Sequence, residues 1–198
     1  MIKENTLKDR DRHTMKKSNI QNKDTVKKER GQFYTTNYEY ILDGFNIPNK
    51  NICCIIEPFA GKGDLIRWCS KKGFEHRIDS YDIEPKYESV ILRDTLKNPP
   101  NYKDSFVITN PPYLARNKTK VKTLFDKYGM NDLYKCFLMS ICNQNNCKGG
   151  IFIIPSGFFL SSRPIDVKCR NEFMTKFKIQ KVKYFEERVF DDTPTTVV

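Results

Sequence analysis

The residues with the clearest chemistry form a tetrapeptide behind a short apolar run. Asn110-Pro111-Pro112-Tyr113 directly follows residues 105–109, whose sequence is Ser-Phe-Val-Ile-Thr. The prolines lack backbone N–H groups, so neighbouring carbonyls are free to accept hydrogen bonds beside the Asn110 amide. Two such acceptors can hold both hydrogens of a planar amino group and release its lone pair for attack on a methyl donor. Tyr113 offers a ring on which a base can stack. The alternative is a Pro-Pro turn that only ends a strand.

A glycine turn and two carboxylates precede the tetrapeptide. Gly61 and Gly63 come after an apolar run, where glycines let the backbone approach a ligand closely. A third glycine, which a dinucleotide fingerprint needs, is replaced by Ile66, so the turn favours a nucleoside over a pyrophosphate. Asp82 lies 19 residues after Gly63, a spacing that suits an acid accepting both ribose hydroxyls.

The residues after Asp82 fit the same ligand. Ile83 would offer an apolar face to an adenine ring, and Asp94 could accept from its amino group. Taken singly, Asp82 and Asp94 are equally explained as solvated turn carboxylates, and the glycines as a tight turn without a ligand. Together the three features favour a nucleoside site.

These groups need a sheet to position them. Apolar runs predict strands at 51–57, 77–82, 89–92, 105–109, 151–154, 179–185 and 195–198, and helical patterns fall at 64–72, 131–144 and 164–177. Such alternation predicts an α/β fold, Rossmann-like, with a mostly parallel sheet and helices on both faces. Ligands of such sheets bind beyond the carboxyl ends of the strands, where the acids and Asn110 lie. The last segment starts a strand without a stop signal, so we expect that strand or a further domain beyond residue 198.

Composition bounds the class of protein. The chain has 198 residues, 35 Lys and Arg against 24 Asp and Glu, and 38% hydrophobic residues, which fits one domain. Its longest apolar runs are far shorter than the ~20 residues of a membrane span, and the N-terminus carries no secretory signal. Seven cysteines without a Cys-x-x-Cys pair predict reduced thiols, no metal site, and an intracellular protein, cytoplasmic if bacterial.

The charge excess is concentrated in residues 1–30, which hold ten Lys or Arg and five acids. This segment has no clean helical or strand period, so we interpret it as a flexible basic arm. It is either a solvated tail without a partner or an electrostatic contact to phosphates. Charge alone does not separate nucleic acid from an acidic membrane surface.

The set of motifs resembles the class I S-adenosylmethionine-dependent DNA adenine N6-methyltransferases of restriction-modification systems, which share an Asn-Pro-Pro-Tyr tetrapeptide. Residues 31–36 (Gly-Gln-Phe-Tyr-Thr-Thr) resemble a Gly-Gln-Phe-aromatic-Thr-Pro segment that lies against the methionine part of the cofactor, with Thr36 in place of proline. Residues 114–118 resemble one subgroup of these enzymes. Residues 188–193 (Arg-Val-Phe-Asp-Asp-Thr) resemble a late motif whose aromatic residue packs against a flipped adenine.

The resemblance implies S-adenosylmethionine as cofactor and no metal. By position it implies a catalytic set of Asn110, Pro111, Pro112 and Tyr113, with base stacking by Tyr113 and Phe190. The cofactor contacts that it implies are Phe33, Tyr34, Thr35, Glu57, Phe59, Gly61, Gly63, Asp82, Ile83, Asp94 and Asn110. Glu57 would face the amino-acid end of the cofactor.

The resemblance also implies partners and a domain plan. DNA is the expected partner, with a cognate restriction endonuclease or specificity subunit as a further one, and no membrane. Residues 31–198 are expected to form the catalytic domain, which lacks the C-terminal target-recognition region usual in these enzymes. The alternatives are an RNA or protein-glutamine methyltransferase, a non-catalytic nucleic-acid-binding subunit or truncated remnant, and a generic nucleotide-binding α/β domain.

Overall fold

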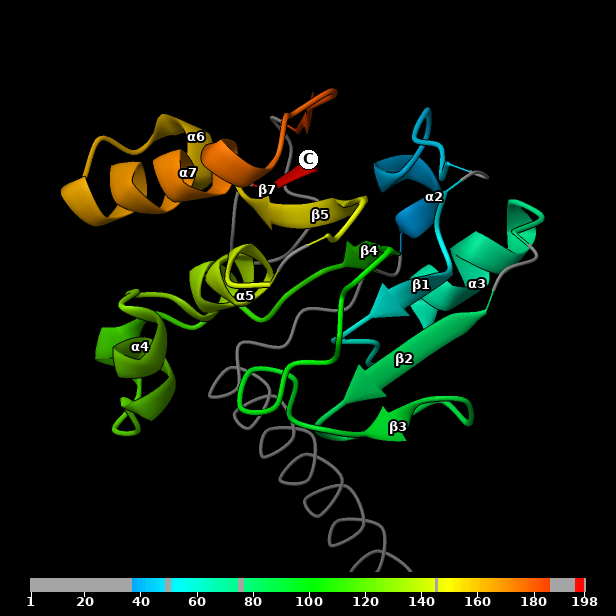
Figure 1. The fold of residues 1–198 in the computed structure, drawn as a ribbon, viewed down its shortest axis with the longest axis horizontal. Helices are drawn as coiled ribbons and strands as arrows, with labels where there is room; N and C mark the ends of the chain where they lie inside the picture. The colour runs from blue at the N-terminus through cyan, green and yellow to red at the C-terminus, as the bar shows by residue number, and fades with distance from the viewer. Residues whose placement is uncertain (1–36, 49–50, 75–76, 145, 186–194, 198) are drawn as a thin grey trace, which may run out of the picture.

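The computed structural model describes residues 37–48, 51–74, 77–144, 146–185 and 195–197 (Figure 1). Its strands form one sheet in the order β3-β2-β1-β4-β5-β7-β6. The strands are β1 (Cys54–Glu57), β2 (Ile78–Asp82), β3 (Ile91–Leu92), β4 (Ser105–Thr109), β5 (Gly149–Pro155), β6 (Lys183–Tyr184) and β7 (Thr195–Val197). The helices are α2 (Tyr38–Ile41), α3 (Asp64–Lys71), α4 (Thr123–Tyr128), α5 (Leu133–Cys142), α6 (Gly157–Leu160) and α7 (Pro164–Lys176), with a 3-10 turn at Arg116–Lys118. The predicted basic arm, residues 1–30, lies outside the described residues.

The sheet changes winding direction between β1 and β4. From β1 the chain steps outward to β2 and β3, then returns to pair β4 with the other side of β1. All pairings from β3 to β5 are parallel, and β7 runs antiparallel to both β5 and β6. This confirms the predicted α/β Rossmann-like fold, and it places the switch point, where ligands of such sheets bind, beyond the carboxyl ends of β1 and β4.

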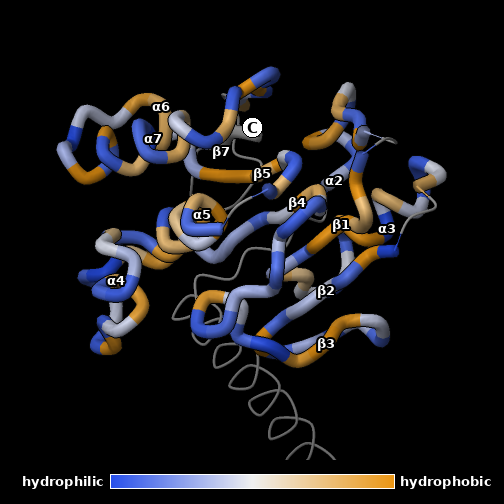
Figure 2. The backbone as a smooth tube through the Cα atoms, in the orientation of Figure 1, coloured by the Kyte–Doolittle hydropathy of each residue, from blue (hydrophilic) through white to orange (hydrophobic). Residues whose placement is uncertain are grey.

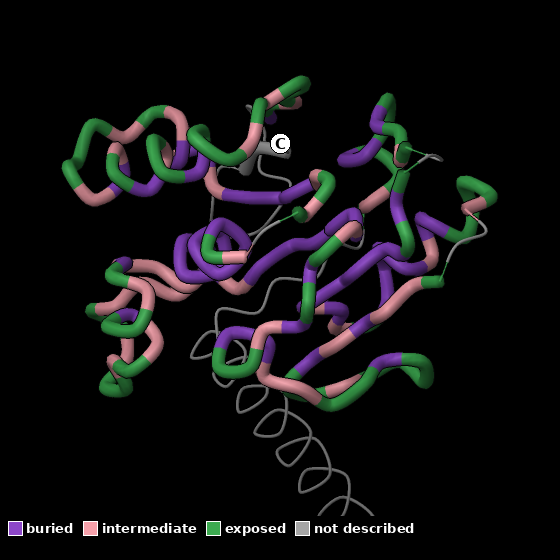
Figure 3. Tube along the Cα trace, viewed as in Figure 1, coloured by how far each residue is buried: buried purple, intermediate pink, exposed green. Residues whose placement is uncertain are grey.

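Helices cover both faces of the sheet. Successive residues of a strand point to opposite faces, so one strand can pack against the helices on both sides. In β1, Cys54 and Ile56 belong to the core cluster that includes α5 and Phe173 of α7. Ile55 between them belongs to a second cluster with Ile41 of α2 and Trp68 of α3. Figure 2 shows the apolar runs of β1 and β5, and Figure 3 shows that the central strands and α5 are buried.

The α5 helix is apolar nearly all round, and such a helix belongs inside the core. Asp132 caps its N-terminus by accepting from the backbone N–H of Tyr134 at 3.4 Å. Every residue from Tyr134 to Cys142 is buried, including the charged Lys135. Among the described residues, no helix combines the length and the apolar character that crossing a bilayer requires.

Several predicted boundaries differ from the observed ones. The strand predicted at 179–185 is reduced to β6, and α2, α4 and α6 were not predicted. Gly149 and Gly150, which precede the strand predicted at 151–154, begin β5 and pair with β4. Glycine fits there because the neighbouring strand approaches closely.

That close approach makes Gly150 intolerant of a side chain. A Cβ there would lie 2.4 Å from the Val107 carbonyl oxygen and 2.6 Å from the Phe152 ring. A carbonyl inside a paired strand cannot move aside, so we expect Gly150→Ala to lower the free energy of unfolding by about 3 kcal/mol in chemical denaturation. Gly157→Ala is the matched control, with nothing within 4 Å of its Cβ, and should change it by less than about 1 kcal/mol. Equal losses in both variants would contradict this account.

Candidate functional site

A cleft lies at the carboxyl edge of the parallel strands, where the winding direction changes. The predicted site residues that line it are Phe59, Gly61, Asp82, Ile83, Asp94, Asn110 and Pro112. Glu57, Gly63, Pro111 and Tyr113 are described but do not line the cleft themselves. Phe33, Tyr34, Thr35 and Phe190 lie outside the described residues. The fold therefore brings the glycine turn, both acids and the start of the tetrapeptide to one cleft.

Asp82 holds the glycine turn in shape. Its Oδ2 accepts from the Gly61 backbone N–H at 2.8 Å, and its Oδ1 accepts from the Glu84 N–H at 2.7 Å. The side chain is nearly buried, with 6% of the residue exposed. Each carboxylate oxygen retains a second lone pair. Asp82 is thus a structural tie between two loops as well as a candidate acceptor at the cleft.

The turn itself depends on glycine. Gly61 has φ +51° and Gly63 φ +78°, in the left-handed region that other residues rarely adopt. A Cβ on Gly63 would also lie 2.7 Å from the Tyr87 ring. Gly63 is the residue before α3, so this turn delivers the chain directly into the helix.

Ile83 and Asp94 line the cleft next to Asp82, and one is apolar and the other acidic. Ile83 is 46% exposed although apolar, and it lines the cleft beside Asp82. Asp94 accepts from the Lys97 backbone N–H at 3.0 Å and forms an ion pair with the Lys97 ammonium at 3.2 Å. Asp94 is therefore a turn carboxylate that also lines the cleft, and its ligand role stays a prediction.

Glu57 is a carboxyl group buried beside the site. Its Oε1 accepts from the Phe59 N–H at 3.1 Å and from the Thr109 hydroxyl at 2.7 Å. Its Oε2 is buried, and no partner for it exists among the described residues. Burial therefore raises the pKa of Glu57 from 4.5 to about 8. The two hydrogen bonds lower this pKa, but their effect is smaller than that of burial. Glu57 and Thr109 join the start of the glycine turn to the residue before Asn110.

The tetrapeptide is anchored in the core through its tyrosine. The Tyr113 hydroxyl lies 2.6 Å from Asn110 Oδ1 and 2.5 Å from the Ile153 carbonyl oxygen. The residue is 9% exposed, and its ring packs edge-on against Tyr134, with centroids 6.2 Å apart. Burial raises the pKa of Tyr113 well above its usual value, so this phenol stays protonated. Tyr113 therefore connects Asn110, at the end of β4, to the neighbouring strand β5.

Sequence reasoning missed several cleft residues. Leu96, Leu124 and Leu133 complete the apolar lining. Leu133 stands four residues before Phe137 in the predicted helix, and that spacing is the one signal that could have placed it. Leu124 belongs to α4, which was not predicted, so nothing in the sequence pointed to it.

The buried carboxyl makes stability depend on pH. Glu57 has a raised pKa, so the folded state binds a proton between pH 4.5 and about 8 that the unfolded state has released, and stability falls as pH rises through this window. We expect the free energy of unfolding to drop by about 1 to 2 kcal/mol from about pH 6.5 to 8, in denaturant titrations of the ligand-free protein. The titrations start at about pH 6.5 because the pKa of Asp132 is raised to about 6, and most of the titration of Asp132 is then complete.

Glu57→Gln is the control, because an amide does not titrate. Its stability should be flat across the same window. A wild-type protein without the decline, or a variant that retains it, would show that Glu57 is not the group responsible.

Comparison with known proteins agrees with this geometry. No curated protein matches the sequence. Residues 3–190, nearly the whole chain, match the Eco57I restriction-modification methylase family. The chain therefore belongs to the Eco57I restriction-modification methylase family, and its role is that of a DNA methyltransferase in restriction-modification.

Proposed function

We propose that this protein transfers a methyl group from S-adenosylmethionine to the N6 amino group of adenine in DNA. The observation that carries the proposal is the shared cleft: Asn110 and Pro112 line it together with Gly61, Asp82 and Ile83. Residues 31–198 would be the catalytic domain and residues 1–30 a basic arm. A cognate restriction endonuclease or specificity subunit would be a further partner.

The cleft suits the proposed cofactor on three counts. Carboxylates of Asp82 and Asp94 border it as hydroxyl and amino acceptors, and Ile83 presents apolar surface to a purine. The Glu57 Oε2 atom is a buried acceptor that an ammonium group would satisfy, next to Phe59, which lines the cleft. When bound, the cofactor supplies a methyl group on a cationic sulfonium.

Asn110 and the Pro111 carbonyl would hold the amino group that is methylated. The Tyr113 phenol has a single proton, so it can donate to Ile153 or to Asn110 but not to both. When it donates to Ile153, its oxygen can accept from the Asn110 Nδ2, and this amide orientation leaves Oδ1 to accept from the substrate. Two acceptors then draw the substrate nitrogen toward tetrahedral geometry and free its lone pair, so catalysis rests on positioning.

An adenine inside a duplex must be extruded to reach Asn110, at a cost of a few kcal/mol. Stacking of the extruded base on Tyr113 and Phe190 remains a prediction. The exposed edge of Tyr113 is small in this structure, because Tyr134 covers part of the ring.

Asn110→Ala tests the proposed chemistry. We expect it to lower methyl transfer to DNA by at least about a hundredfold, because it removes one of the two acceptors, while leaving cofactor affinity within about twofold. Labelled methyl transfer to DNA, RNA and protein pools, with mass spectrometry of the nucleosides, gives the product. Asn98→Ala is the control, since Asn98 is exposed and its carbonyl oxygen holds Arg93. N6-methyladenine at wild-type rates from Asn110→Ala, or methylated RNA or glutamine in place of DNA adenine, would refute the proposal.

Cofactor binding should also release a proton. At about pH 7 Glu57 is protonated in the ligand-free protein, because its pKa is about 8, and an ammonium group placed at Oε2 favours the charged carboxylate. Calorimetric titration of the cofactor in buffers of different ionisation enthalpy should show close to one proton released. Glu57→Gln should release none. Release that is the same in both proteins would remove Glu57 from the cofactor site.

A further inference from the structure

The segment directly behind the tetrapeptide is strongly basic. Residues 114–122 read Leu-Ala-Arg-Asn-Lys-Thr-Lys-Val-Lys, with four cations and no acid. The segment starts one residue after Tyr113, and Asn110 lies at the cleft. Lys118 and Lys120 of this segment are eight and ten residues beyond Asn110, the residue that would hold the target base.

The cations of this segment have different roles. The Lys122 ammonium donates to the carbonyl oxygens of Arg116 and Thr119, so it closes the loop. Arg116 forms an ion pair with Asp126 at 2.5 Å. Lys118 and Lys120 are exposed on the loop that Lys122 holds closed. Two cations thus build the loop, and two face the solvent.

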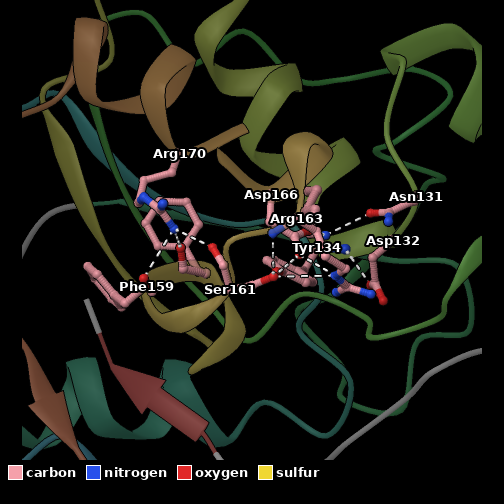
Figure 4. A network of polar contacts seen from close by, with 10 residues as sticks. Asn131, Asp132, Tyr134, Phe159, Ser161, Arg163, Asp166 and Arg170 are labelled. Atoms are coloured by element: carbon pink, nitrogen blue, oxygen red, sulfur yellow. Dashed lines mark hydrogen bonds and ion pairs between the residues drawn. The ribbon is translucent and has the colours of Figure 1, made fainter. Parts of the chain in front are cut away.

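A further exposed cation, Arg163, lies on the segment that follows β5 and α6. The Arg163 side chain is 70% exposed, yet its Nε donates to Asp166 Oδ2 at 2.7 Å (Figure 4). A guanidinium has five N–H groups, so this bond orients the fork and leaves four donors. Arg170 donates to the Phe158 carbonyl at 2.7 Å, which fixes the same segment from α7. The guanidinium of Arg163 is therefore exposed to solvent and held in one orientation.

A buried ion pair connects the two segments. The Arg116 backbone N–H donates to the Asn131 carbonyl at 2.8 Å, and the Lys135 ammonium donates to Asn131 Oδ1 at 2.7 Å. Lys135 is also paired with Asp166. Asp166 in turn holds Arg163 (Figure 4). Lys135 and Asp166 are 2% and 1% exposed. A buried pair of this kind contributes little net stability compared with apolar residues, but it fixes geometry.

We propose that Lys118, Lys120 and Arg163 contact DNA phosphates near the base at Asn110, and that the Lys135–Asp166 pair keeps their two segments in register. Phosphates fit because these cations are exposed and the 114–122 segment contains no acid. Phosphate contacts set the position of a duplex without reading its sequence. The proposal rests on the proposed function only in taking Asn110 as the residue that holds the base.

The first test measures binding of random-sequence duplex DNA by fluorescence anisotropy between about 50 and 200 mM salt. Lys118→Gln/Lys120→Gln should bind about tenfold more weakly at low salt, and the slope of log affinity against log salt should fall by about two. The matched control is Lys176→Gln/Lys178→Gln. This pair removes the same charge from exposed positions in a groove at the amino end of β5. A control that weakens binding as much as the test pair would mean that only net charge matters, and would overturn the proposal.

The second test addresses the ion pair. Arg163→Gln should lower the salt slope by about one. Lys135→Met/Asp166→Leu replaces the pair by apolar groups and should weaken DNA binding to a similar extent, without changing cofactor affinity. Adding Arg163→Gln in that background should then have little further effect, because its guanidinium is no longer oriented. Full additivity, or unchanged DNA affinity in Arg163→Gln, would refute the role of Arg163. Because the readout is binding, a failure here is separate from a failure of N6 methylation.

Discussion

The parallel pairing of β1 with β4 is the constraint on which the site depends. Cys54 of β1 lies opposite Ser105 of β4, and this register brings Glu57 and Thr109 within hydrogen-bond reach at 2.7 Å. The glycine turn begins just after Glu57, and Asn110 comes immediately after Thr109. A slip of one residue would turn the side chains of β4 to the opposite face and separate these ends. One strand pair therefore sets where the glycine turn and the tetrapeptide stand relative to each other.

The positions of the main strands and helices could be predicted because they depend on local sequence patterns. The strand predicted at 105–109 has the observed bounds of β4, and the helix predicted at 64–72 differs from α3 by one residue. Buried parallel strands are continuous apolar runs, so these segments stand out in the sequence. The helix α4 was not predicted because it is short, and its formation depends on packing of Phe125, which is buried in the core.

The chemistry of individual side chains was harder to predict, because it depends on contacts distant in sequence. The Tyr113 hydroxyl meets a carbonyl 40 residues away, on β5, which no spacing rule reveals. Lys135 is a single cation in an apolar helix, and only the fold shows that Asp166 neutralises it. The raised pKa of Glu57 likewise follows from tertiary burial and not from its neighbours in the chain.

The two hydrogen bonds of Asp82 have a thermodynamic consequence for ligand binding. Because Gly61 and Glu84 are already tied to this carboxylate, both loops have their shape before any ligand arrives. A ligand then does not have to order them, and its affinity is not reduced by the entropy of loop closure. The change in heat capacity on binding would come mainly from covering exposed apolar surface such as Ile83, with little contribution from folding of the loops. Asp82 would thus make the cleft a preorganised receptor for the proposed cofactor.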